Sequence, residues 1–474
     1  MGQEIEHSHF RKQDFLEFEA HLHEETQLLD DYFQQNRFES GHPVAGFELE
    51  AWLIDREGQP LPANDRFLDV LDSDLVTPEL ALFNVELNCT PRSIQGRSLS
   101  KMQSELEKTW KKCQTAANKI DASLVTIGIL PTIREQALIL DNMSAMTRYR
   151  ALNEGVRRLR KGDLIKLDIV GREKLKTWHE DVMLESAATS FQVHMQIPPT
   201  LAARTYNAAA ILSAPMIAIS ANSPFMFGHD LWDETRIPVF EQAVSVSTTK
   251  DNSDARVTFG HNYVKESLLE CFTENIERYP ILLPEPLDPD PSHFSHLQLH
   301  NGTIWRWNRP LIGFDNKGKP HLRIEHRALP SGPTLVDMIA NAALFYGMVQ
   351  RFSHCSTPPE SRLPFVHALD NFYQCARDGL RSDLRWFDGA HVNVRVLLTE
   401  KLIPTARRGL DELGVAHEDI EFYMGIIEQR LKSGQTGCAW QRAWAEKHGR
   451  DMKELTLAYR DNQTHGQPVH EWTL

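Results

Sequence analysis

Four short segments of this 474-residue chain alternate apolar residues with side chains that could bind a cation or an anion. Glu48 and Glu50 alternate with apolar residues in the first segment, Glu86 does so in the second, and His194 and Glu325 do so in the third and fourth. Period-two alternation is typical of strands with one apolar and one polar face. The polar positions are Glu48, Glu50, Asn84, Glu86, Asn88, Gln192, His194, Gln196, Arg323, Glu325 and Arg327.

These polar faces could simply be the water-exposed side of an antiparallel sheet. However, such faces usually mix Lys, Ser and Thr with the acids, and none of these three types occurs here. Glutamates facing one another across a sheet destabilise it, so a cation is expected among them. Oxygen-rich ligands with one imidazole favour magnesium or manganese, whereas zinc would need clustered His or Cys. Glu48 and Glu50, roughly 7 Å apart along one strand, could bind two neighbouring ions.

The strands are expected at 46–54, 83–89, 190–197 and 321–328, with amphipathic or buried helices between them at 14–36, 98–120, 201–219 and 334–352. Thr334 is the expected N-cap of the last of these helices, and Asp337 occupies the capping-box position. The sheet is thus assembled from distant parts of the chain, and the predicted class is α+β. Residues 1–357 are predicted to form the catalytic domain and residues 358–474 a helical extension, with its clearest helices at 419–431 and 437–459.

The composition excludes several classes of protein. A net charge of −14 argues against a nucleic-acid surface, and the longest apolar run, 208–221, is interrupted and too short to span a bilayer. The chain begins without a basic stretch followed by an apolar one, and its six cysteines form no close pair. A cytoplasmic protein with reduced thiols is therefore expected. Neither of the common glycine-rich phosphate-binding motifs occurs.

The order of these motifs resembles the glutamate-cysteine ligase family, in its carboxylate-amine ligase branch. The matching runs, within residues 44–350, are GFELE at 46, PELALFNVELNCTP at 78, QVH at 192, ANSPF at 221 and RIEHR at 323. The resemblance implies a glutamine-synthetase-like fold: a curved antiparallel sheet with helices on its outer face, whose concave polar face forms a funnel for ATP and several magnesium ions.

The resemblance also implies roles for individual residues. The expected metal ligands are Glu48, Glu50, Glu79, Glu86, Gln192, His194 and Glu325. Arg323 and Arg327 flank Glu325, and the three are the expected catalytic residues, because a guanidinium fork suits phosphate oxygens. Arg256 and Tyr263 are expected on a segment that contacts the substrate or the nucleotide.

The segment 305–309 contains two tryptophans and two arginines. Arg306 or Arg309 is a candidate ligand contact, with Arg306 the one assigned to the nucleotide. The alternative is that the tryptophans pack and the arginines form surface ion pairs. His296 and His300 are four residues apart, but they are expected to be structural.

A carboxylate is a poor electrophile, so amide formation requires its conversion into an acyl phosphate first. The expected activity is ATP-dependent joining of the γ-carboxylate of glutamate to an amine, with cysteine the expected amine. A different amine, ammonia, or a non-catalytic nucleotide-binding protein on the same scaffold remain alternatives. The expected partners are small-molecule substrates, and a homo-oligomer is compatible with the sequence.

Overall fold

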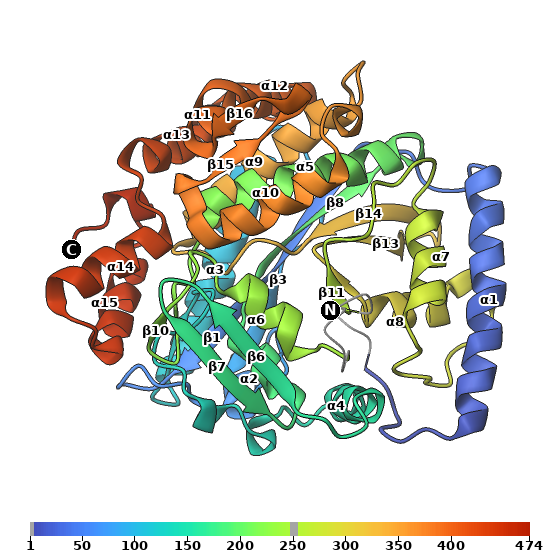
Figure 1. The fold of residues 1–474 in the computed structure, drawn as a ribbon, viewed down its shortest axis with the longest axis horizontal. Coiled ribbons are helices and arrows are strands. Elements are labelled where there is room, and N and C mark those ends of the chain that lie inside the picture. The colour runs from blue at the N-terminus through green and yellow to red at the C-terminus, as the bar shows by residue number, and fades with distance from the viewer. Residues whose placement is uncertain (1–3, 247–254) are drawn as a thin grey trace.

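The computed structural model describes residues 4–246 and 255–474. Its centre is an antiparallel sheet with the strand order β13-β14-β8-β1-β3-β2, and the short strands β4 and β5 also pair with β1. The sheet curls into a half-barrel, with helices around it (Figure 1). The strand bounds are β1 Val44–Ile54, β2 Val76–Pro78, β3 Asn84–Asn88, β4 Arg92–Ser93, β5 Ser123–Val125, β8 Phe191–Ile197, β13 Asn308–Phe314 and β14 Pro320–His326.

The apolar face of the sheet is covered by two long helices, α5 (Ala202–Ser220) and α9 (Leu335–Ser353). Both are buried almost all round, as expected of helices enclosed between a sheet and further helices. Tyr346 of α9 donates hydrogen bonds from its hydroxyl to the carbonyl oxygens of Gly46, at 3.1 Å, and His194, at 3.4 Å. These contacts bind α9 to the backs of two strands whose other face is polar.

Helix α9 begins and packs as its sequence requires. The Thr334 hydroxyl accepts a hydrogen bond from the Asp337 amide, so the predicted N-cap is confirmed. Further along, α9 crosses α12 (Ile403–Glu412) very closely. A Cβ added at Gly409 would lie 1.9 Å from the Gly347 carbonyl oxygen, so these two glycines permit the close approach.

In the C-terminal portion, α10 (Phe365–Asp378) packs on α5 and α12 packs on α9. A buried ion pair joins Arg430 of α13 (His417–Ser433) to Asp337 of α9 at 2.7 Å. The division at 357/358 stays a prediction. The single helix expected at 437–459 is wrong, because Gly449, with φ +95°, interrupts it and separates α14 (Gly437–His448) from α15 (Met452–His465).

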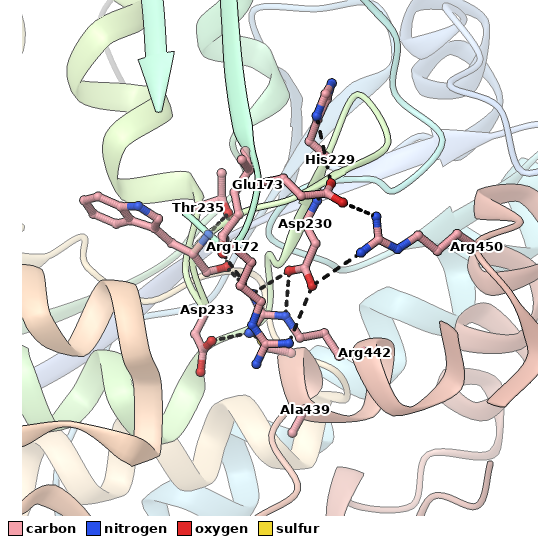
Figure 2. Close-up of polar contacts among 12 residues, drawn as sticks. Arg172, Glu173, His229, Asp230, Asp233, Thr235, Ala439, Arg442 and Arg450 are labelled. Carbon is pink, nitrogen blue, oxygen red and sulfur yellow. Dashed lines mark hydrogen bonds and ion pairs between the residues drawn. The ribbon is translucent and has the colours of Figure 1, made fainter. Parts of the chain in front are cut away.

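An ion-pair cluster attaches α14 to the hairpin of β9 (Phe225–Met226) and β10 (His229–Asp230). Figure 2 shows the Arg442 guanidinium between the carboxylates of Asp230 and Asp233. The same guanidinium donates to the carbonyl oxygens of Leu231 and Trp232. With both carboxylates and Arg442 nearly buried, this cluster fixes the C-terminal helices against the segment that follows the ANSPF turn.

At the opposite side of the molecule from α14 and α15, helix α1 (Lys12–Gln34) packs on α7 (Leu269–Arg278) and α8 (Ser295–Gly302) (Figure 1). Glu25 accepts hydrogen bonds from the amides of His296, at 3.2 Å, and Leu297, at 2.7 Å, and so caps α8. The Nδ1 atom of the buried His296 side chain also lies 2.6 Å from Glu25, which is the kind of structural role predicted for this residue.

The remaining elements are shorter or peripheral, and none of the helices in 4–246 or 255–474 is both long and apolar enough to cross a bilayer. The other helices are α2 Asn64–Leu71, α3 Ser98–Asn118, α4 Thr147–Leu159, α6 Arg236–Ala243, α10 Phe365–Asp378 and α11 Val394–Leu397. The other strands are β6 Ile165–Val170, β7 Lys174–His179, β11 Val257–Thr258, β12 Trp305–Arg306, β15 Asp383–Arg385 and β16 His391–Asn393.

Candidate active site

The register of the central strands brings the predicted polar residues together on the concave face. Glu50 pairs with Glu86 across β1 and β3, and Glu325 pairs with His194 across β14 and β8. Residues directly opposite on one face have Cβ atoms about 4.5–5.5 Å apart, so their side chains must interact. The pairing therefore places the side chains of Glu50 and Glu86 directly opposite each other on the concave face.

One cluster consists of Glu48, His194 and Glu325, whose potential ligand atoms lie within 4.8 Å of one another. The His194 Nε2 atom is 3.6 Å from Glu48 and 3.7 Å from Glu325. Arg309 holds Glu325 with a fork, its Nε at 2.8 Å and its Nη2 at 3.1 Å. Burial alone would raise the pKa of Glu325, but Arg309 and a second guanidinium outweigh it and lower that pKa, so Glu325 is a fixed anion.

A second cluster consists of Glu50, Glu79 and Glu86, again with ligand atoms within 4.8 Å of one another. Burial and the charge of Glu79 raise the pKa of Glu50 to about 7. Burial and the neighbouring carboxylates Glu48 and Glu79 raise the pKa of Glu86 well above its usual value. Burial and mutual repulsion thus favour the protonated forms of Glu50 and Glu86, and a cation bound among the carboxylates would favour the ionised forms.

Gln192 and Arg327 lie between the two clusters. The Gln192 amide nitrogen donates to Glu50 at 2.9 Å, and its oxygen accepts from Arg327. Arg327 also donates to Glu325 at 3.0 Å. Its Nε atom is buried and has no hydrogen-bond partner in the described part of the chain. One side of the guanidinium is thus held by the protein, while a donor on it is left for a ligand.

The five glutamates of the two clusters line one cavity of about 320 Å³. Apolar residues of its wall come from α4, α7, α8, the loop after α7 and the strands β12 and β13. The apolar residues there are Leu152, Phe272, Leu283, Leu299, Trp305, Leu311 and Ile312. The cavity therefore combines a charged region on the sheet with apolar surface on the neighbouring elements.

A family model for glutamate-cysteine ligase family 2 (GCS2) matches residues 44–458, which is most of the chain. The chain belongs to this family. It is therefore an ATP-dependent carboxylate-amine ligase. No curated protein matches it in sequence.

Two solved structures share the fold. A glutamate-cysteine ligase from Francisella tularensis, in complex with AMP, has a TM-score of 0.53 and 11% identity, covering 92% of this chain and 96% of that one. A bifunctional glutathione synthetase from Pasteurella multocida has a TM-score of 0.51 and 10% identity, covering 95% of this chain and 55% of that one. At these identities the likeness shows the architecture, which confirms the predicted fold class.

Among the residues expected to contact substrates in this ligase, Arg323 and Arg327 line the cavity. Arg256 and Arg306 are fully buried outside its wall. Arg256 donates to the Thr303 carbonyl oxygen at 3.0 Å, and Arg306 donates to Asn275 at 2.9 Å. The structure therefore places these two arginines behind the wall, where they support it.

The remaining candidates, Tyr263 and the residues of segment 305–309, differ in whether they line the cavity. The Tyr263 ring meets Phe365 edge to face, with centroids 5.2 Å apart, away from the cavity wall. Arg306 and Arg309 both form ion pairs, as the alternative interpretation held, but these pairs are buried rather than on the surface. Trp307 is fully buried, whereas Trp305 lines the cavity.

Three further cavity residues had no sequence signal. Arg148 and Tyr149 lie at the start of α4, where the Tyr149 hydroxyl donates to Glu79 at 3.3 Å. Glu185 lies on the short 3₁₀ helix Val182–Ala187, and burial and the charge of Glu79 raise its pKa to about 8. Residues on loops and short helices lack the alternation that marked the strands, so only the folded chain reveals them.

Proposed function

We propose that this ligase uses ATP and magnesium to activate the γ-carboxylate of glutamate as an acyl phosphate, which it joins to the amino group of cysteine. The main observation behind this proposal is that the glutamates of two clusters line the same cavity, with Arg327 between the clusters. Family membership supports ligase chemistry, and the geometry supports the roles of the individual residues.

The residues present fit two hard divalent cations. Each cluster supplies three ligand atoms within 4.8 Å of one another, and five of the six residues involved are glutamates. Burial and the charge of Glu79 raise the pKa of Glu50, and a cation bound in this cluster would lower it again. Oxygen donors of this kind suit magnesium, or manganese, better than zinc. When bound, such ions withdraw charge from the phosphates of ATP and from the acceptor carboxylate.

The chain's own residues then position the reacting groups. Arg327 lies between the clusters and would bind the γ-phosphoryl group of ATP, and Arg323 adds a second guanidinium to the same cavity wall. The apolar wall around Phe272 and Leu299 suits the adenine base. Little covalent work is left for the protein, so catalysis rests on positioning and on stabilising the charge of the transferring group.

The reaction balances in two steps. An oxygen of the γ-carboxylate attacks the γ-phosphorus of ATP, and ADP leaves with the bonding pair. The amine nitrogen then attacks the acyl carbon, the carbon–oxygen bond to phosphate breaks, inorganic phosphate leaves with that pair, and the nitrogen gives up one proton. The product is an amide at the glutamate side chain.

The test is ADP release with ATP, magnesium and glutamate against a panel of cysteine, 2-aminobutyrate, glycine, methylamine and ammonium, with the products identified by mass spectrometry. We expect release stimulated by cysteine and a γ-glutamylcysteine product. Stimulation by another amine alone would replace cysteine in the proposal. No glutamate-dependent release with any amine would refute ligation and favour a non-catalytic nucleotide-binding protein.

A further inference from the structure

A second cavity, of about 600 Å³, lies between α1 and the elements on which α1 packs. Helix α1 forms one side of this cavity, and the end of α4, the end of α7 with the residues after it, and α8 form the other. None of the described residues in its wall lines the main cavity. A space of this size accommodates a small organic molecule.

Two buried side chains in the wall of this cavity have polar atoms without partners. His300 and Tyr279 are 3% and 2% exposed, and neither the His300 Nδ1 atom nor the Tyr279 hydroxyl has a hydrogen-bond partner in the described part of the chain. The His300 Nε2 atom lies 3.1 Å from the carbonyl oxygen of Asn275, which can only accept, so Nε2 carries the ring proton and Nδ1 is an acceptor. Burial lowers the pKa of His300, which keeps the ring neutral at pH 7.

These two atoms indicate the chemical group that would pair with them. The His300 Nδ1 atom needs a donor, whereas the Tyr279 hydroxyl can donate or accept. A hydroxyl group on a ligand can donate to the ring nitrogen and accept from the tyrosine. Because a buried polar atom without a partner costs free energy, a ligand with such a group gains affinity from both contacts.

The charged residues of the wall favour an anion over a cation. They are Lys12, Arg158 and Glu19, two cations and one carboxylate. Among the residues that the structure describes, neither cation forms an ion pair. The Arg158 guanidinium lies 4.3 Å from the centroid of the Phe15 ring and donates to the carbonyl oxygen of Ile281 at 3.4 Å. Its charge is therefore available to a carboxylate on a ligand.

Most of the remaining wall is apolar and suits an aromatic ring. The apolar side chains are those of Phe10, Phe15, Leu22, Leu159, Ile276 and Ile281. We propose that this cavity is a second binding site, separate from the main cavity, for a small aromatic acid that carries a hydroxyl group. The ring packs on the apolar side chains, the hydroxyl pairs with His300 and Tyr279, and the carboxylate pairs with Arg158 and Lys12.

The site lies behind the main cavity, on the same helices. His300 stands between Leu299 and Asn301 in the sequence of α8, and both of these neighbours line the main cavity. Ile276 lies one turn of α7 after Phe272, which also lines the main cavity. A ligand in the second cavity thus contacts the reverse side of these helices and leaves the main cavity free for a nucleotide.

The first test measures binding to the wild-type protein by isothermal titration calorimetry, with saturating ADP and magnesium so that the main cavity is occupied. The probe is 3-(4-hydroxyphenyl)propionate, which we expect to bind with a Kd below about 1 mM. Without the hydroxyl, 3-phenylpropionate should bind about threefold or more weakly. With a cation in place of the carboxylate, 2-(4-hydroxyphenyl)ethylamine should bind about tenfold or more weakly.

The second test uses Tyr279→Phe, which removes only the hydroxyl. No hydrogen bond of the described protein is lost, so the variant should unfold at the wild-type temperature. It should bind the hydroxy acid about threefold or more weakly than wild type and bind 3-phenylpropionate equally well. The matched control is Tyr263→Phe, because that hydroxyl is also buried without a partner among the described residues but lies outside the cavity wall. The control should bind both acids as wild type does.

Four results would overturn the proposal. Absence of binding by the hydroxy acid would mean that the cavity holds only water. Equal affinity of wild type for the two acids, or an unchanged affinity of Tyr279→Phe for the hydroxy acid, would mean that the unpartnered atoms select no hydroxyl group. Displacement of the hydroxy acid by ADP would place it in the main cavity.

Discussion

Replacing Glu86 with Gln should weaken the binding of magnesium without changing the stability of the metal-free protein. Glu86 is 2% exposed and belongs to the cluster with Glu50 and Glu79. Burial and the neighbouring carboxylates raise the pKa of Glu86 well above its usual value, which favours its protonated form in the metal-free protein. Gln has nearly the same size as a protonated Glu, and its oxygen can still accept the 3.2 Å hydrogen bond from Asn88. The metal-free variant should therefore unfold at the same temperature as metal-free wild type.

With magnesium the two proteins should differ. An ion present at 100 times its dissociation constant stabilises the folded state by about 2.7 kcal/mol. At about 2.1 cal/mol/K per residue, the unfolding entropy of a 474-residue chain is roughly 1 kcal/mol/K, so one such site raises Tm by about 3 °C. Loss of a ligand should weaken binding by about 100-fold or more, which reduces this contribution to below about 0.5 °C.

The assay is thermal unfolding by circular dichroism, with EDTA and with a magnesium series, alongside turnover of the same samples. Glu107→Gln, an exposed carboxylate on α3, is the matched control and should behave as wild type. The reasoning would fail if Glu86→Gln kept both the magnesium-dependent rise in Tm and full turnover, since Glu86 would then be a buried residue that binds no ion.

Three other changes test other parts of the structure. Arg327→Lys should lower kcat and kcat/KM together by roughly tenfold or more, because an ammonium cannot reproduce the two parallel donors of a guanidinium. Steady-state kinetics that show only a higher KM for ATP would instead assign Arg327 to ground-state nucleotide binding. Gly409→Ala should destabilise the protein by about 1–3 kcal/mol, because the added Cβ would lie 1.9 Å from the Gly347 carbonyl oxygen. The measurement is urea unfolding, and the control is Gly425→Ala, which adds a Cβ in open space. Equal stability of the two variants would contradict the close crossing of α9 and α12. Burial lowers the pKa of His300 to about 4, so the unfolded chain binds a proton that the folded chain does not between pH 6.5 and 4. Wild type should therefore lose stability relative to His300→Gln as the pH falls through this window, by about 1.4 kcal/mol per pH unit at mid-window, and parallel urea-unfolding curves would refute this.

The strand pattern alone predicted much of the site. Side chains alternate across a strand, so Glu48 and Glu50 had to share a face, and the same holds for the polar residues of each other strand. The sheet register then placed Glu325 opposite His194 and Glu86 opposite Glu50. The helix ends were predicted well where a cap marks them, as at Thr334, but the break at Gly449 was missed.

Long-range contacts had no such local signal. Glu79 lies between β2 and β3, and its place beside Glu50 depends on the folding of that connection onto the sheet. Glu185 reaches the cavity from a short helix, and Arg309 reaches it from the edge strand β13, which was not predicted. A residue outside regular alternation has no face that can be assigned from its neighbours in the sequence.

The sequence by itself therefore determined which carboxylates, amides and imidazole lie on one surface of the sheet, because strand geometry ties side-chain direction to residue number. Only the tertiary structure decided how these groups divide into two clusters and that Arg327 and Gln192 lie between them. It also decided that Arg256 supports the wall from behind rather than lining it. These outcomes depend on distances between segments far apart in the chain, which are set by packing around the sheet and not by local preference.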